Sequence, residues 1–81
     1  VELWMLSFSN NKNGKYTIFC KNSGQIILVK HYVNNLLHGE YTYYWENGQI
    51  RFSGIFSENR RIGTWINYDK NGIIIFKEKF S

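Results

Sequence analysis

The residues that could bind a metal ion are few and widely spaced in this sequence. They are two histidines, His31 and His38, and a single cysteine, Cys20. Zinc sites take their ligands as closely spaced pairs of Cys and His, and these three residues lack that spacing. We therefore expect no bound metal ion and no other cofactor.

The acidic residues do not form a recognisable catalytic group. The six carboxylates are scattered along the chain, mostly near expected turns, at Glu2, Glu40, Glu46, Glu58, Asp69 and Glu78. No serine lies in the strand-turn-helix setting of a hydrolase nucleophile. The Asn-Gly pairs are not followed by a helix whose amino terminus could bind phosphate. The sequence therefore predicts a protein that is not an enzyme and has no small-molecule substrate.

A run of aromatic residues offers chemistry for binding instead. Tyr41, Tyr43, Tyr44 and Trp45 are close together, and neighbours on a strand point to opposite faces. Some of these rings must therefore face outward from a single-layer sheet. Tyr, Trp and Arg are enriched at the energetic centres of protein interfaces. The predicted partner-binding residues are Tyr43, Trp45, Arg51, Arg60 and Arg61.

The other two aromatic residues of the run belong to a repeating pattern with a structural role. Tyr41 and Tyr44 recur as Tyr16 and Phe19 and as Trp65 and Tyr68, and we expect these rings to stack between repeats. The whole pattern is Gly39, Tyr41, Tyr44, Gly48, Ile50, Phe52 and Phe56, then Gly63, Trp65, Tyr68, Gly72, Ile74, Phe76 and Phe80, with an earlier copy at Gly14, Tyr16, Phe19, Gly24, Ile26, Leu28 and Tyr32. A period of this size indicates an array of small supersecondary units.

The repeats define the domain organisation. We expect a single domain over residues 1–81, made of a half-repeat at 1–13 and repeats at 14–38, 39–62 and 63–81. Each repeat predicts two strands, because Asn47-Gly48 and Asn71-Gly72 separate strand-like runs and are typical of hairpin turns with positive φ at both residues. The first repeat is one residue longer, which predicts a three-residue loop with Gly24 in the left-handed conformation.

Asn-containing turns are expected between the repeats, at Asn34-Asn35 and Glu58-Asn59, because Asn tolerates a left-handed backbone. The aromatic residues of each first strand lie three apart, which predicts a bulge or sharp twist between them. In each second strand, alternating residues form three columns of expected core: Ile26, Leu28 and Tyr32; Ile50, Phe52 and Phe56; Ile74, Phe76 and Phe80. The predicted fold is all-β: an antiparallel meander of stacked hairpins with about seven strands in one elongated, twisted sheet.

The pattern Gly-x-aromatic-x-x-aromatic, followed by Asn-Gly and a strand ending in Tyr or Phe, resembles the MORN-repeat-variant family, a bacterial relative of the MORN repeat. The resemblance is carried by residues 39–48 and 63–72, with 14–24 as a looser copy, and it covers nearly the whole chain. It implies a sheet of stacked hairpins that acts as a binding or scaffolding module without an active site. Some bacterial members are described as antitoxin-like.

Composition is consistent with a folded binding domain. The chain is 43% hydrophobic and 19% aromatic, too apolar for disorder, and no apolar run approaches the ~20 residues of a membrane span. A lone cysteine and the absence of a basic leader favour a cytoplasmic location, and a removed signal peptide is compatible with a chain that does not begin with Met. The net charge of +4 favours acidic partners in general.

The leading functional hypothesis is a protein-binding module that inhibits or neutralises a target protein. The alternatives are a nucleic-acid or anionic-membrane binder that uses a basic and aromatic surface, and a structural segment of a longer repeat scaffold. The last strand also predicts self-association as a homodimer, because residues 72–76 would form an unpaired apolar edge. The residues expected to mediate it are Ile73 and Ile75.

Overall fold

The computed structural model describes residues 12–80, so nearly all of the half-repeat expected at residues 1–13 lies outside the described part. The described strands are β1 (Gly14–Phe19), β2 (Ile26–Val33), β3 (Leu36–Leu37), β4 (Gly39–Tyr44), β5 (Ile50–Ser57), β6 (Arg60–Tyr68) and β7 (Ile74–Phe80). No helix occurs between residues 12 and 80, and the all-β prediction is confirmed. The two-residue strand β3 was not predicted.

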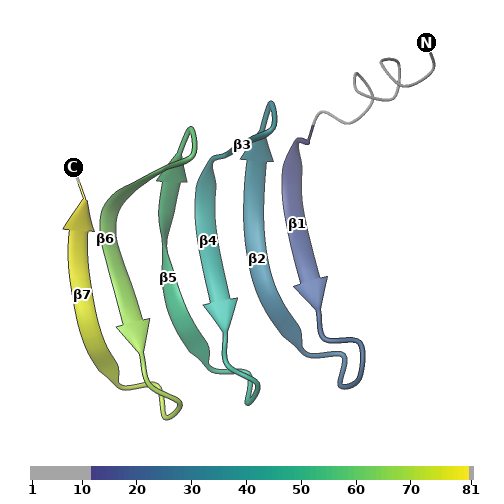
Figure 1. The fold of residues 1–81 in the computed structure, drawn as a ribbon, viewed down its shortest axis with the longest axis vertical. Helices are drawn as coiled ribbons and strands as arrows, with labels where there is room; N and C mark the ends of the chain where they lie inside the picture. The colour runs from purple at the N-terminus through teal and green to yellow at the C-terminus, as the bar shows by residue number, and fades with distance from the viewer. Residues whose placement is uncertain (1–11, 81) are drawn as a thin grey trace.

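The strands form one open antiparallel sheet. Its order is β1-β2-β4-β5-β6-β7, and β3 pairs with β2 beside the turn that joins them. Figure 1 shows the hairpins side by side in a single layer, with β1 (purple) and β7 (yellow) as the outermost described strands. The shortest extent of the molecule is 14 Å, which leaves no room for a second layer. The predicted meander of stacked hairpins is therefore confirmed.

The turns between repeats have the conformation that the asparagines predict. The backbone φ is positive at all four central residues: Asn34 (50°), Asn35 (71°), Glu58 (49°) and Asn59 (68°). Asn59 also contacts the preceding repeat, since its Oδ1 accepts a hydrogen bond from the Leu37 N–H at 2.7 Å and its own N–H donates to the Leu37 carbonyl at 2.9 Å. Each such turn thus joins neighbouring hairpins.

Replacing Asn59 by alanine is expected to lower the free energy of unfolding by about 1 to 2 kcal/mol, because alanine lacks the side-chain acceptor and resists a left-handed backbone. Urea denaturation would measure the loss. Asn59→Gly is the matched control, since glycine adopts this backbone freely and removes only the side chain. Equal losses in the two variants would show that the backbone conformation contributes nothing.

The turns inside the repeats differ from the prediction. Gly48 has a φ of 89°, but Asn47 is not left-handed. The Gly48 N–H donates to the Trp45 carbonyl at 3.0 Å and the Trp45 N–H donates to Gln49 at 2.7 Å, which defines a three-residue loop ending in a left-handed glycine. The Asn47 side chain favours this conformation because its Oδ1 accepts from the Gln49 N–H at 2.9 Å.

The corresponding loops of the other repeats also end in a left-handed glycine. Gly72 is left-handed and Asn71 is not, while Asp69 Oδ1 accepts from the Asn71 and Ile73 N–H groups. In the first repeat Gly24 is left-handed, as predicted, with a φ of 74°. Its loop has four residues rather than the expected three, because the closing hydrogen bond runs from the Cys20 N–H to the Gln25 carbonyl.

The predicted irregularity in each hairpin is confirmed, and the extra residue belongs to the second strand. The register shifts between Tyr43 and Tyr44, which lie opposite Phe52 and Ile50, so Arg51 is the additional residue. Ile27 and Ile75 take the same place in the other hairpins. A bulge interrupts the alternation of faces. The prediction of a core position is therefore wrong for the residues that precede the bulges, since Ile26, Ile50 and Ile74 are all exposed.

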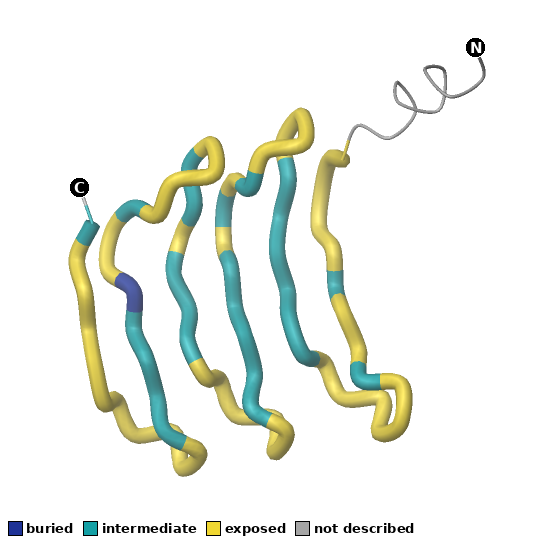
Figure 2. Tube along the Cα trace, in the orientation of Figure 1, coloured by how far each residue is buried: buried dark blue, intermediate teal, exposed yellow. Residues whose placement is uncertain are grey.

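The core is small and centred on β6. Trp65 is only 3% exposed and is the one buried residue between 12 and 80 (Figure 2). Its ring packs against Tyr41, Phe52 and Phe56, with centroids 5.9, 6.2 and 5.1 Å away. The inter-repeat role expected for Tyr41 and Trp65 is therefore confirmed. Phe76, predicted to be core, is 55% exposed because β7 lies at the edge of the described sheet.

Candidate functional site

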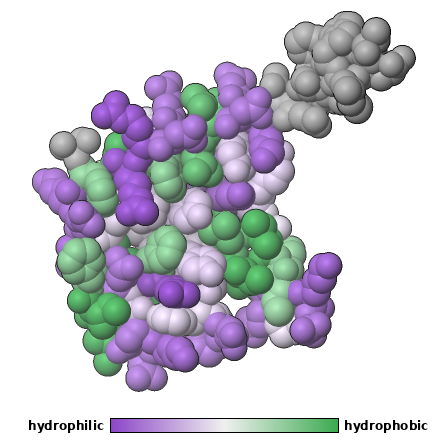
Figure 3. All heavy atoms as spheres, in the orientation of Figure 1, coloured by the Kyte–Doolittle hydropathy of each residue, from purple (hydrophilic) through white to green (hydrophobic). Residues whose placement is uncertain are grey.

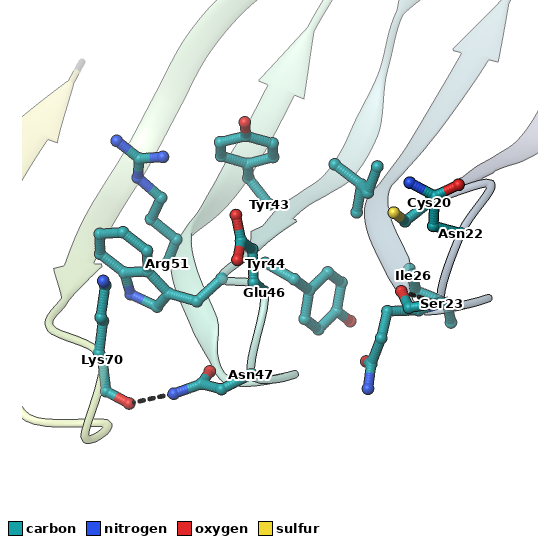
Figure 4. Close-up of a pocket in the computed structure, with 13 residues that line it drawn as sticks. Cys20, Asn22, Ser23, Ile26, Tyr43, Tyr44, Glu46, Asn47, Arg51 and Lys70 are labelled. Atoms are coloured by element: carbon teal, nitrogen blue, oxygen red, sulfur yellow. Dashed lines mark hydrogen bonds between the residues drawn. The ribbon is translucent and has the colours of Figure 1, made fainter.

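A groove of about 810 Å³ crosses the sheet near the hairpin loops that follow β1, β4 and β6. Each of the three repeats contributes to its lining. Figure 4 shows the lining side chains, with Arg51 and Lys70 at one end of the groove and Cys20 at the other. The residues that matter for its chemistry are Cys20, Tyr43, Trp45, Glu46, Arg51 and Lys70. Three of the five predicted partner-binding residues are among them.

Arg51 is the centre of this group. Its Cζ lies 4.4 Å from the centroid of the Trp45 ring and 5.4 Å from that of Tyr43. The bulge explains the arrangement, because the extra residue of β5 departs from strict alternation and can share a face with Tyr43 of β4 and with Trp45, which follows that strand. The predicted proximity of Tyr43, Trp45 and Arg51 is thus present in the structure.

The Trp45 ring is held in place from the next repeat. Its Nε1 donates a hydrogen bond to the Tyr68 carbonyl at 3.1 Å, and the Lys70 Nζ lies 5.6 Å from its centroid. Asn47 makes a parallel link, donating to the Lys70 carbonyl at 2.7 Å (Figure 4). Sequence reasoning missed Lys70. It precedes Asn71-Gly72 in the third hairpin loop, and the repeat register could have placed it beside the second loop.

Two cations therefore flank one indole without a carboxylate partner. Among residues 12–80, neither Arg51 nor Lys70 makes an ion pair, although Glu46 lines the same groove. A guanidinium stacked on an aromatic face keeps its in-plane N–H groups free to bind a carboxylate in a bidentate manner. The groove can therefore bind an acidic group next to half-buried aromatic rings.

Arg60 and Arg61 are not brought to this groove. Arg61 is the second residue of β6 and lies opposite Phe56, whereas Arg51 is adjacent to Phe52 on the same neighbouring strand. Four residues of strand separate these positions, a distance of about 13 Å. The Arg61 Cζ instead lies 5.0 Å from the Trp65 centroid and 5.6 Å from that of Phe80. Arg61 thus covers the core tryptophan.

Cys20 lies at the end of the groove formed by the first hairpin loop (Figure 4). Hydrogen bonds from the Ser23 backbone and hydroxyl, and then from the Asn22 backbone, lower the pKa of the Cys20 thiol. Hydrogen bonding to the thiolate explains the direction of this change. The cysteine has no disulfide partner, since it is the single cysteine of the chain.

The edge strand carries the predicted apolar run. Ile73, Ile74, Ile75 and Phe76 are 61, 46, 63 and 55% exposed. Figure 3 shows strongly hydrophobic atoms, coloured green, along the lower part of the β7 side of this face. Both residues predicted for self-association, Ile73 and Ile75, therefore have accessible side chains.

The part of the chain that the structure describes contains no group of three or more His, Cys, Asp or Glu residues arranged to hold a metal ion. It also contains no helix of the length and hydropathy needed to cross a membrane. Comparisons with models of protein families, with curated proteins and with solved structures found no match.

Proposed function

We propose that this domain is a non-enzymatic protein-binding module that holds an acidic segment of a target protein in the groove around Arg51. The observation that carries the proposal is the Arg51 guanidinium over the rings of Trp45 and Tyr43, with Lys70 nearby and, among residues 12–80, no carboxylate bound to either cation. A carboxylate would pair with the cations while apolar groups of the target cover the rings, which is the Tyr, Trp and Arg chemistry of interface centres. The net charge of +4 supports an acidic target.

A nucleic-acid partner fits the groove less well. Base stacking needs a free aromatic face. The Trp45 ring already has Arg51 at 4.4 Å and Lys70 at 5.6 Å from its centroid.

An inhibitory or antitoxin-like role belongs to the same proposal, because a small rigid domain that covers an acidic surface can block the target's other contacts.

Changing Arg51 to alanine is expected to weaken target binding by about 2 kcal/mol, roughly thirtyfold, while leaving the melting temperature nearly unchanged. Arg60→Ala is the matched control, since Arg60 is exposed and lies at the far end of β6. Extract of the native host, with and without nuclease treatment, would be passed over the native domain and both variants, with mass spectrometry to identify retained proteins and titration to measure Kd.

The supporting result is a protein retained by the native domain and by Arg60→Ala but lost with Arg51→Ala. Binding that disappears on nuclease treatment, or that falls as steeply with salt as counterion release requires, would identify a nucleic acid as the partner. Equal retention by both variants would show that the groove is not the binding site.

A further inference from the structure

The two ends of the groove around Arg51 differ in their chemistry. Arg51 and Lys70 bring positive charge to one end, whereas Ile27 and Cys20 line the part that the first repeat contributes. The half-buried Tyr44 lies between the two ends (Figure 4). A ligand that fills the whole groove must therefore present an acidic group and an apolar group at a fixed separation.

The register of the sheet gives this separation. Leu28 lies opposite Tyr43, and Tyr43 lies opposite Phe52, so the three residues form one line across β2, β4 and β5. Ile27 and Arg51 precede the outer two members of this line, and each is the extra residue of its bulge. Ile27 and Arg51 are therefore at the same level on strands two steps apart, a separation of about 9.5 Å.

This separation favours one backbone conformation of a bound peptide segment. Side chains on one face of an extended β-strand recur at about 6.8 Å or about 13.5 Å, and neither distance matches. A polyproline II helix has about three residues per turn and a rise of about 3.1 Å per residue, so its side chains recur on one face at about 9.3 Å. One turn of polyproline II therefore spans the step from Arg51 to Ile27.

The lining of the groove suits the same conformation. Grooves that bind polyproline II segments are lined by aromatic side chains. Tyr43, Tyr44 and Trp45 supply three aromatic side chains here. A bound α-helix would instead need apolar anchors at several positions of one face, and the groove offers cations at one of its two contacts.

Glu46 determines which end of the groove takes the acidic group. Hydrogen bonds from Ser23 and Asn22 lower the pKa of the Cys20 thiol. The negative charge of Glu46 acts on this thiol in the opposite direction, so Glu46 is within electrostatic range of the end formed by the first repeat. A ligand carboxylate at that end would be repelled, and the ligand residue there must be uncharged.

We propose that the groove recognises a polyproline II segment of the target in which an acidic residue is three positions from a large aliphatic residue. The carboxylate pairs with Arg51 and Lys70, and the aliphatic side chain packs on Ile27. The two residues between them lie over the tyrosine rings. This inference rests on the proposed function, since it specifies the acidic segment that binds at Arg51.

End-blocked fluorescent peptides would test the spacing on the native chain. Asp-Pro-Pro-Leu and Leu-Pro-Pro-Asp cover both chain directions, and their isomers Asp-Pro-Leu-Pro and Pro-Leu-Pro-Asp have the same composition with a spacing of two. In anisotropy titrations, one of the first two peptides is expected to bind roughly tenfold more tightly than its isomer. A difference below about threefold in both pairs, or no binding by any of the four, would overturn the proposal.

Substitutions in the protein would show which contact each end of the peptide makes. Arg51→Ala should remove the preference for Asp over Asn in the peptide, and Ile27→Ala should remove the preference for Leu over Ala. Ile55→Ala is the matched control, since Ile55 is exposed and does not line the groove, and it should change neither preference. Acidic peptides that bind through Arg51 whatever their spacing would overturn this inference and leave the proposed function standing. Peptide binding that is insensitive to Arg51→Ala would overturn both.

Discussion

Replacing Trp65 by alanine is expected to lower the free energy of unfolding by about 3 to 5 kcal/mol, a large share of what a domain of this size possesses. Trp65 is the buried residue around which Tyr41, Phe52 and Phe56 pack, and its Nε1 donates to the Ile55 carbonyl at 3.3 Å. A single-layer sheet has no second core to compensate. Urea denaturation followed by fluorescence or circular dichroism would measure the loss.

Trp45→Ala is the informative comparison for this result. Trp45 also donates to a neighbouring repeat, but it lines an open groove and contacts Arg51 and Lys70 rather than a cluster of rings. We expect a distinctly smaller loss of stability than for Trp65→Ala. Equal losses would show that Trp45 is a core residue and would remove it from the binding site.

The fold could be predicted from the sequence because the same types of turn and strand residues recur in each repeat, so that each local prediction is supported more than once. Glycines and asparagines recur at turns, and the Asn34-Asn35 and Glu58-Asn59 turns have the predicted left-handed backbone. The turn around Asn47 was predicted wrongly because the Asn47 side chain accepts a hydrogen bond from the Gln49 N–H and stabilises a different turn. Side-chain capping of this kind depends on geometry that an Asn-Gly pair does not specify.

The core was harder to predict because period-two reasoning assumes a flat strand. One extra residue per hairpin, such as Arg51, shifts the phase of everything before it, so Ile50 was wrongly assigned to the core. The same bulge brings Arg51 to Tyr43 and Trp45. The proximity of these three residues could be predicted from the local sequence because they flank one loop. Arg61 could not be placed without the register, which sets it opposite Phe56.

Replacing Gly54 by alanine is expected to destabilise the domain by roughly 3 kcal/mol, at the upper end of the range for overpacking. A Cβ at this position would lie 2.1 to 2.5 Å from three atoms of the Trp65 ring. The ring is rigid and surrounded by other aromatic residues, so it cannot retreat without losing its packing. Among the three repeats only this one has glycine here; Lys30 and Glu78 take the equivalent places. Thermal unfolding would show the loss as a reduced Tm.

The double variant decides whether the tryptophan is the cause. If Gly54 is required because the indole lies on it, Gly54→Ala should cost almost nothing in a Trp65→Ala background, and the two losses should be far from additive. The residual effect should then be small and of either sign, since alanine suits a strand better than glycine when space allows. Additive losses would instead mean that Gly54 is needed for its backbone, and that the large aromatic of β6 and the glycine of β5 stabilise the sheet independently.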